Sequence, residues 1–329
     1  MNIDQHPTVQ LHRKRTPASP RPVDAALLRA LALEAGADDV GFVAIDRPEI
    51  ASQKADILSV LPQARTLVAF VVRMNRDSIR SPARSVANLE FHRTGDESNE
   101  VARRIVRALN ELGYRAVNPA MGFPMEMDRF PGKGWVVAHK PVAVAAGLGV
   151  MGIHRNVIHP RFGNFILLGT VVTDLDLGSE TRPLDFNPCL ECKLCVAACP
   201  VGAISKEGAF DFTACYTHNY REFMGGFTDW VEQIADSKNG RAYRERVTDA
   251  ESASMWQSLS FGANYKAAYC LAVCPAGEDV IGPFLQSRKE FVHDVVRPLE
   301  DKVETVYVLP GSDAEAQSRA ASRTRRSVA

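Results

Sequence analysis

Three stretches in the first half of the chain carry apolar residues at helical spacing. In residues 25–35 the apolar positions lie three or four apart, and Gly36 follows them as a stop signal. Residues 50–61 predict a second helix. Ser98 is placed to cap a third, in which apolar residues form one stripe and which Gly113 ends. We therefore expect three helices in this part of the chain.

Nearly continuous apolar runs alternate with these helices. The predicted strands are Val40–Ile45, Thr66–Val72, Tyr114–Val117 and Phe165–Thr173. Such runs suit strands whose two faces are both covered by helices. A further helix is predicted at Val136–Ala146. The alternation of helix and strand predicts an α/β layer in this half.

The pattern changes at Cys189–Pro200, where four cysteines are spaced two, two and three residues apart and a proline closes the run. This spacing is typical of bacterial ferredoxins that hold a cubane iron–sulfur cluster. In two-cluster proteins the fourth cysteine of such a run serves the other cluster. A second half follows, with Cys215 and then residues 270–275, which read Cys-Leu-Ala-Val-Cys-Pro.

We expect two clusters whose ligands come from both halves. The loop with the first three cysteines wraps three corners of one cluster, and the later Cys-Pro supplies its missing corner. The first set is Cys189, Cys192, Cys195 and Cys274, and the second set is Cys199, Cys215 and Cys270. Seven cysteines for eight corners leave one ligand of the second cluster open. Structural zinc ligands or buried free thiols are the alternative, and they fit this triple spacing less well.

A glycine-rich segment follows the helix predicted at Val136–Ala146. Residues 146–152 read Ala-Gly-Leu-Gly-Val-Met-Gly, so the backbone is able to lie close to a flat ligand. The alternative is a tight turn from helix to loop. A dinucleotide-binding fingerprint requires a preceding strand, whereas a helix precedes this segment, which argues against a nicotinamide site.

The balance of charge gives no electrostatic case for binding nucleic acid or membranes, because Lys plus Arg and Asp plus Glu both number 39. No apolar run approaches the roughly 20 residues of a membrane span. The polar N-terminus has no signal-peptide core. We therefore expect a cytoplasmic protein whose cysteines are metal ligands rather than disulfides.

The chain is expected to comprise two domains with polar ends. A disordered arm is predicted at 1–21, an α/β domain at 22–180, a ferredoxin-like domain at 181–300 and a disordered tail at 311–329. An insert at 216–269 is predicted to be helical around Asp229 to Arg246, and a last helix is predicted near Val280–Phe291.

Several motifs in a fixed order carry a resemblance to a known group. These are Ala146–Gly149, Gly152, His159–Gly163, Thr173–Leu175 and the run Cys189–Pro200 with Val201–Ile204. Together they resemble the corrinoid-dependent iron–sulfur reductases, which include epoxyqueuosine reductases and reductive dehalogenases. The likeness covers roughly residues 24–290.

The resemblance implies a nitroreductase-like α/β domain that binds cobalamin, followed by a bacterial two-cluster ferredoxin-like domain. Electrons would pass from an external donor, such as ferredoxin or flavodoxin, through the two clusters to cobalt. The residues that the resemblance assigns to close approach or charge contact with the corrinoid are Gly147, Leu148, Gly149, Gly152, His154 and Arg155.

The sequence departs from the family at three points. The aspartate that precedes the glycine segment in epoxyqueuosine reductases is missing, and the nearest acid is Asp128. One expected ligand of the second cluster is Ala267, which leaves either a [3Fe-4S] cluster or a [4Fe-4S] cluster with a substitute ligand such as His218 or Tyr269. The helical repeats that often follow the ferredoxin module are also missing, which argues against a transfer-RNA substrate.

Candidate catalytic residues are His139, Lys140 and Asp128, because a proton donor must face the reducing centre. His154 is a further candidate for this role. The alternative for His139 is a structural role, because a histidine in a helix is often a plain hydrogen-bonded group. The leading hypothesis is a cobalamin-dependent reductase that dehalogenates or deoxygenates a small organic molecule. The alternatives are an iron–sulfur electron-transfer protein and a corrinoid-activating factor.

Overall fold

A four-stranded antiparallel sheet lies at the centre of the first domain. The computed structural model describes residues 2–14, 19–130, 132, 134–266, 268–320 and 325–328. The sheet has the order β1-β2-β6-β3, formed by β1 (Asp39–Ala44), β2 (Thr66–Arg73), β6 (Ile166–Thr173) and β3 (Ala116–Val117). In its register Val68 pairs with Phe42 on one side and with Val171 on the other.

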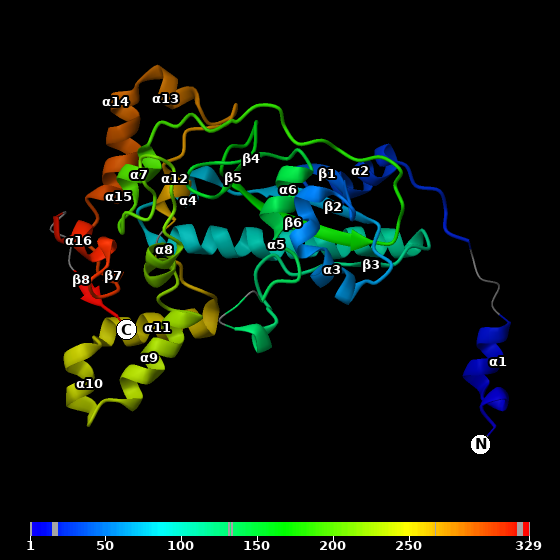
Figure 1. The fold of residues 1–329 in the computed structure, drawn as a ribbon, viewed down its shortest axis with the longest axis horizontal. Helices are drawn as coiled ribbons and strands as arrows, with labels where there is room; N and C mark the ends of the chain where they lie inside the picture. Colours follow the sequence, from blue (N-terminus) through cyan, green and yellow to red (C-terminus); the bar gives the residue numbers. More distant parts are fainter. Residues whose placement is uncertain are drawn as a thin grey trace.

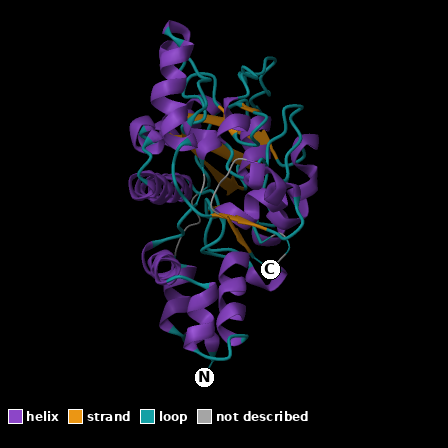
Figure 2. Cartoon of the chain, turned by 90° about the vertical axis from the view of Figure 1, so that its left-hand side faces the viewer, coloured by secondary structure: helices purple, strands orange, loops and turns teal. Residues whose placement is uncertain are grey.

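Helices cover both faces of this sheet, as the apolar runs predict. Leu67, Ala69 and Val71 point to one face, where they pack with α3 (Lys54–Val60), α6 (His139–Ala145) and the 3₁₀ helix η2 (Pro48–Gln53). Their neighbours Val68 and Phe70 point to the opposite face, against α2 (Ala25–Glu34) and α5 (Arg84–Glu111). Figure 1 shows α5 running the length of the sheet, and Figure 2 shows the strands between helices. The mixed α/β fold is thus confirmed.

The start of α5 differs from its prediction. Ser98 does not cap this helix but lies in the middle of its 28 residues, and its Oγ has no hydrogen-bond partner among the described residues. The buried face of the N-terminal half is lined by small residues such as Thr94 and Gly95. Because these are not apolar, hydrophobic periodicity does not reveal that half of the helix.

The second domain consists of short helices. They are α7 (Leu194–Ala198), α8 (Phe212–Asn219), α12 (Tyr269–Ala272), α13 (Gly282–Gln286), α14 (Arg288–Phe291), the π-helix η4 (Val292–Val296) and α15 (Arg297–Glu300). The predicted insert forms a helical lobe of α9 (Gly225–Ala235), α10 (Gly240–Arg246) and α11 (Asp249–Phe261) (Figure 1). The predicted last helix is two shorter ones, α13 and α14.

The short elements that remain connect or flank these parts. They are η1 (Ile3–Gln5), α1 (Pro7–Arg13), α4 (Arg76–Arg80), η3 (Met127–Arg129), β4 (Val150–Met151), β5 (Val157–Ile158), β7 (Val306–Val308), α16 (Asp313–Ala320) and β8 (Arg325–Ser327). Strands β4 and β5 form a small antiparallel pair. No helix in the described part of the chain has the length and apolar character that a membrane crossing needs.

Both ends of the chain differ from the predicted disorder where they are described. The arm contains η1 and α1, although neither buries a residue. In the tail, β8 pairs in parallel with β7, and Ala314 of α16 packs in a small core with Val306 and Val308. Composition missed this structure because the tail supplies few apolar residues and depends on β7 for its partner. Residues 1, 15–18, 321–324 and 329 of these predictions lie outside the described residues.

Candidate iron–sulfur site

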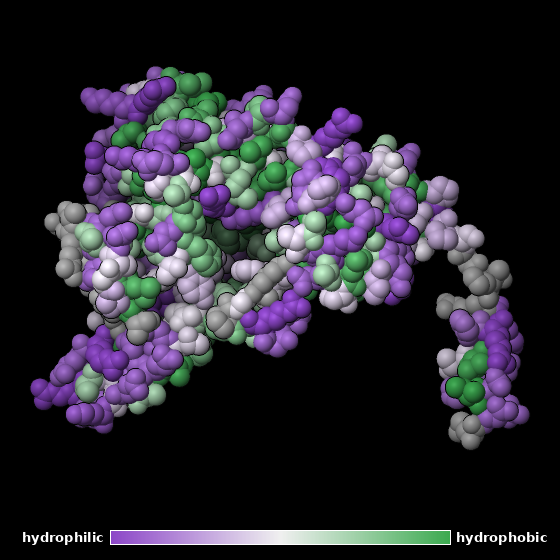
Figure 3. Space-filling view, viewed as in Figure 1, coloured by the Kyte–Doolittle hydropathy of each residue, from purple (hydrophilic) through white to green (hydrophobic). Residues whose placement is uncertain are grey.

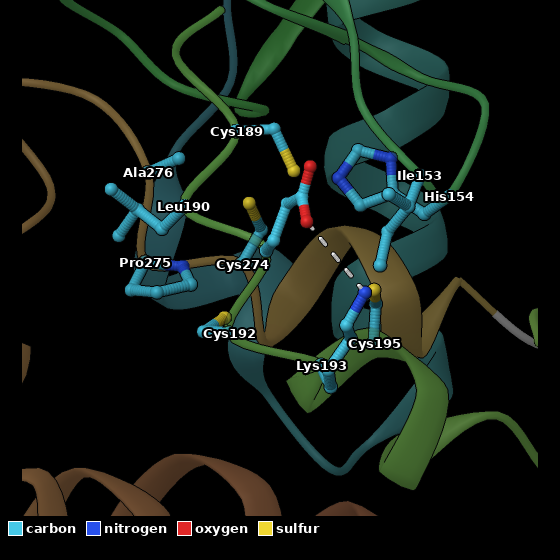
Figure 4. Close-up of a pocket in the computed structure, with 11 residues that line it drawn as sticks. Ile153, His154, Cys189, Leu190, Cys192, Lys193, Cys195, Cys274, Pro275 and Ala276 are labelled. Atoms are coloured by element: carbon cyan, nitrogen blue, oxygen red, sulfur yellow. Dashed lines mark ion pairs between the residues drawn. The ribbon is translucent and has the colours of Figure 1, made fainter. Parts of the chain in front are cut away.

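Four cysteines from two distant segments border one cavity. Cys189 and Cys192 lie on the loop before α7, Cys195 lies in that helix, and Cys274 follows α12. The cavity is small and partly open to solvent (Figure 4). The structure thus brings together the whole set that spacing assigns to the first cluster.

The local backbone explains how three closely spaced cysteines reach one cavity. Glu191 and Lys193 have φ angles of 49° and 64°, in the left-handed region that non-glycine residues adopt infrequently. The chain therefore turns sharply on both sides of Cys192 before α7 begins. Glu191 and Lys193 also line the cavity and form an ion pair of 3.9 Å.

Burial makes these thiols weak acids. Burial first, and then the charges of the other cysteines of the group, raise the pKa of Cys195 and of Cys274 to about 12. Iron binds the thiolate, so loading this site must release protons. Four thiols around one cavity are the donor set that a cubane cluster takes. In the described residues, no group of three or more His, Cys, Asp or Glu side chains is arranged to hold a single metal ion.

A second group of cysteines lies beside the first. Cys199 ends α7, Cys215 is in α8 and Cys270 is in α12. Burial raises the pKa of Cys270, and the negative charges of Cys199, Cys215 and Cys195 act in the same direction. The backbone N–H of Ala203 donates to Cys199 Sγ at 3.2 Å. These three sulfurs are the predicted second set.

The eighth corner stays open. Ala267, which stands where the family has a cysteine, lies outside the described residues. The hydroxyl of Tyr269 donates to the carboxylate of Glu304. His218 is fully buried, and its Nδ1 accepts a hydrogen bond from the backbone N–H of Tyr307 at 3.3 Å. Both substitute ligands thus have partners within the protein.

Both ring nitrogens of His139 have hydrogen-bond partners. Its Nδ1 lies 2.9 Å from Thr170 Oγ1 and its Nε2 lies 2.9 Å from the carbonyl oxygen of Ala120. Burial lowers the pKa of the imidazole. These contacts fasten α6 to β6 and favour the structural role over proton donation. Asp128, the other acid–base candidate, is exposed on η3.

The glycines of residues 146–152 are required by packing within the protein. A Cβ on Gly147, which has a φ of 73°, would meet the carbonyl oxygen of Arg182. A Cβ on Gly149 would lie 2.5 Å from the carbonyl oxygen of Ile158, and one on Gly152 would lie 2.8 Å from His154 Cε1. Leu148 is buried in the core beside the sheet. This close packing favours a tight turn, and corrinoid contact by these residues stays a prediction.

His154 and Arg155 differ in their surroundings. His154 lines the cavity of the first cysteine group, and its Nδ1 accepts a hydrogen bond from the backbone N–H of Asn156 at 3.1 Å. Burial, together with the charge of Lys140, lowers the pKa of His154 to about 4, so the ring is neutral at pH 7. Arg155 is exposed.

Lys140 reaches the second cysteine group through Asn156. Its Nζ donates to Asn156 Oδ1 at 3.0 Å and to the carbonyl oxygen of Arg155 at 2.7 Å. Asn156 Nδ2 in turn donates to Cys270 Sγ at 3.9 Å. Sequence reasoning gave Asn156 no role, although it follows directly on His154 and Arg155.

Arg80 is a second residue that sequence reasoning missed. Its guanidinium packs over the rings of Phe165 and Phe291 at 5.1 and 5.2 Å, and its Nε donates to the carbonyl oxygen of Ala272 at 3.2 Å. Burial lowers the pKa of Arg80 to about 10, and the nearby Cys274 opposes that shift. No sequence signal marks Arg80, because its neighbours come from distant segments.

One family model and several curated relatives match the chain. Residues 183–205 match the model described as a 4Fe-4S binding domain. An epoxyqueuosine reductase of Synechococcus sp. is 30% identical over 216 residues, which span 61% of this chain and 58% of that protein. Another, of Gloeobacter violaceus, is 27% identical over 188 residues, or 57% of this chain and 56% of that protein. A tetrachloroethene reductive dehalogenase of Dehalobacter restrictus is 32% identical over 146 residues, or 44% of this chain and 24% of that protein.

These relatives confirm the resemblance that the motifs carry, and by name they are oxidoreductases. The matched segment spans little more than half of the two epoxyqueuosine reductases. Among solved structures, epoxyqueuosine reductase from Streptococcus thermophilus aligns with a TM-score of 0.47 and 16% identity over 83% of this chain and 75% of that one. A reductive dehalogenase whose structure suggests a mechanism for B12-dependent dehalogenation aligns with a TM-score of 0.47 and 17% identity over 77% of this chain and 40% of that one.

Proposed function

We propose that the chain is an iron–sulfur oxidoreductase whose cysteines hold two clusters and deliver single electrons to a reducing centre in the first domain. The observation that carries this proposal is the joint cavity of Cys189, Cys192, Cys195 and Cys274, which unites segments some 80 residues apart. The match of residues 183–205 to a 4Fe-4S binding domain supports it.

The two cysteine groups are arranged for electron transfer between them. Cys195 and Cys199 belong to different groups but lie at one short helix, α7. Cys195 also lies near enough to Cys270 to raise the pKa of that thiol. Clusters at the two groups would therefore be neighbours. Each would gain or lose one electron at a time, and the buried thiolates would stay bound throughout.

Cobalamin enters the proposal through the resemblance of the sequence motifs to the corrinoid-dependent reductases. It would supply a metal centre that holds electrons next to a substrate. The glycine segment does not fit as its cradle, because Gly147 and Gly149 are filled by the chain's own backbone. Figure 3 shows the surface hollowed between the sheet domain and the region of α7 and α8, which is a better place for a large cofactor.

The substrate class follows from the curated relatives. We propose reductive cleavage, as in dehalogenation, or removal of oxygen, as in epoxyqueuosine reduction, of a small organic molecule. The external donor would be a ferredoxin or a flavodoxin. Transfer RNA is the less favoured substrate, since the chain has no charge excess. The cytoplasmic location stays a prediction.

The packing of the glycine segment favours a second candidate, an iron–sulfur electron carrier without substrate chemistry. One experiment separates the two. The protein is purified without air and with hydroxocobalamin supplied, and iron, sulfide, cobalt and the electron paramagnetic resonance (EPR) spectrum are measured. Clusters together with stoichiometric cobalt support the reductase, and clusters without cobalt support the carrier. Zinc without sulfide contradicts both.

A further inference from the structure

Lys140 keeps contact with solvent, and its Nζ is turned toward protein oxygens beside the second cysteine group. Burial lowers its pKa, and the charges of Cys270 and Cys215 act against that shift. In the described part of the chain, no carboxylate lies within ion-pair distance of its Nζ. The side chain hydrogen-bonds only to neutral oxygens, on Arg155 and Asn156.

Asn156 connects this cation to a sulfur. Its amide oxygen accepts from Lys140 Nζ at 3.0 Å, which fixes the amide so that Nδ2 faces Cys270 Sγ at 3.9 Å. The two residues come from different elements, since Lys140 is in α6 and Asn156 lies between β4 and β5. The first domain thus presents a positive charge and an N–H donor to the second cysteine group.

We propose that Lys140 and Asn156 raise the reduction potential of the cluster held by Cys199, Cys215 and Cys270, and so control the flow of electrons through it. The inference rests on the proposed function, because it requires that cluster. In the step concerned, the oxidised cluster accepts one electron from an external low-potential donor. No bond forms or breaks and no proton moves.

The physical reason is the change in charge on reduction. The reduced cluster would carry one more negative charge, and a nearby cation stabilises that form more than the oxidised one. A hydrogen bond to a ligand sulfur acts in the same direction, since potentials depend on charge and on hydrogen bonds to the sulfurs. The second cluster is thereby a better acceptor than its buried thiolates alone would make it.

An EPR-monitored redox titration of the full chain with dithionite tests the inference. In Lys140→Met we expect the equilibrium constant for reducing the second cluster to fall at least tenfold, which is about 59 mV for one electron. The potential of the first cluster should not change. Lys140→Arg should restore most of the shift, and Asn156→Ala should give a smaller shift of the same sign. The loss of one signal in Cys215→Ala identifies the second cluster.

Arg155→Gln is the matched control, because Arg155 is exposed like Lys140 but its side chain is not among the described hydrogen-bond partners of Asn156. The inference is overturned if Lys140→Met leaves the potential unchanged, or if it shifts no more than Arg155→Gln does. If Lys140→Met fails to assemble the cluster, an unshifted potential in Asn156→Ala overturns it instead. A wild-type protein without clusters contradicts the proposed function. A second-cluster potential that does not change in Lys140→Met contradicts only this inference.

Discussion

Replacing Gly163, which lies between β5 and β6, by alanine should displace Cys274 of the first cysteine group. Gly163 has a φ of 64°, and a Cβ there would lie less than 3.0 Å from the carbonyl oxygen of Ala276, two residues beyond Cys274. That segment is held to the turn at residues 160–161 by the backbone bonds of Glu278 to Pro160 and Asp279 to Arg161, each 2.9 Å. Backbone cannot move aside cheaply, so the loop that carries Cys274 must shift.

The expected cost has two parts. An L-residue in the left-handed region costs about 1–2 kcal/mol, and overpacking adds about 1–3 kcal/mol. Gly178→Ala isolates the first part, because Gly178 has a φ of 62° and a Cβ there would meet nothing within 4 Å. Gly163→Ala should therefore be less stable than Gly178→Ala by about 1–3 kcal/mol, or roughly 2–12 °C in melting midpoint.

The assay is thermal unfolding without air, followed by circular dichroism, with iron and EPR measured on the same samples. Gly163→Ala should also lose the signal of the first cluster in preference to that of the second. Equal melting midpoints and equal cluster content in the two variants would refute the reasoning.

Three further predictions concern single residues. Cys274→Ser should remove the first cluster and Cys215→Ser the second, each leaving the other EPR signal in place; the loss of both signals in either variant contradicts the ligand sets. His139 has a lowered pKa in the folded protein, so unfolding takes up protons below about pH 6.5 and stability falls as the pH drops through that range. His139→Gln should weaken this pH dependence in melting curves at pH 5 and 7, and an unchanged slope would assign it to other groups. Ala267→Cys should add iron and abolish any three-iron signal, and if both stay as in wild type, position 267 is not the missing corner.

Apolar periodicity predicted the strands and several helices because these elements bury continuous or evenly spaced apolar residues. It missed the N-terminal half of α5, where Thr94, Gly95 and Ser98 face the core. It also missed the order of the tail, where β8 depends on pairing with β7. The buried residues in this half of α5 are small or polar, and β8 requires a partner strand outside its own segment, so a local apolar pattern reveals neither of them.

The candidate site was likewise predicted from the sequence only in part. Cysteine spacing predicted which sulfurs meet, because short loops fix their geometry. The surroundings of Lys140 depended on Asn156 and Cys270, which tertiary packing brings together. The sequence correctly predicted that the glycines of residues 146–152 allow another group to lie close to the backbone. That group is another part of the protein and not a ligand.

The lobe of α9, α10 and α11 leaves the domain just after Cys215 and returns just before Cys270. Both connections between the lobe and the rest of the chain therefore lead to cysteines of the second group. The entropy of closing such a loop depends only weakly on its length. We therefore expect that a lobe of another length or sequence can replace this one without changing the arrangement of the seven cysteines. Loss of the second cluster would release both connections of the lobe together.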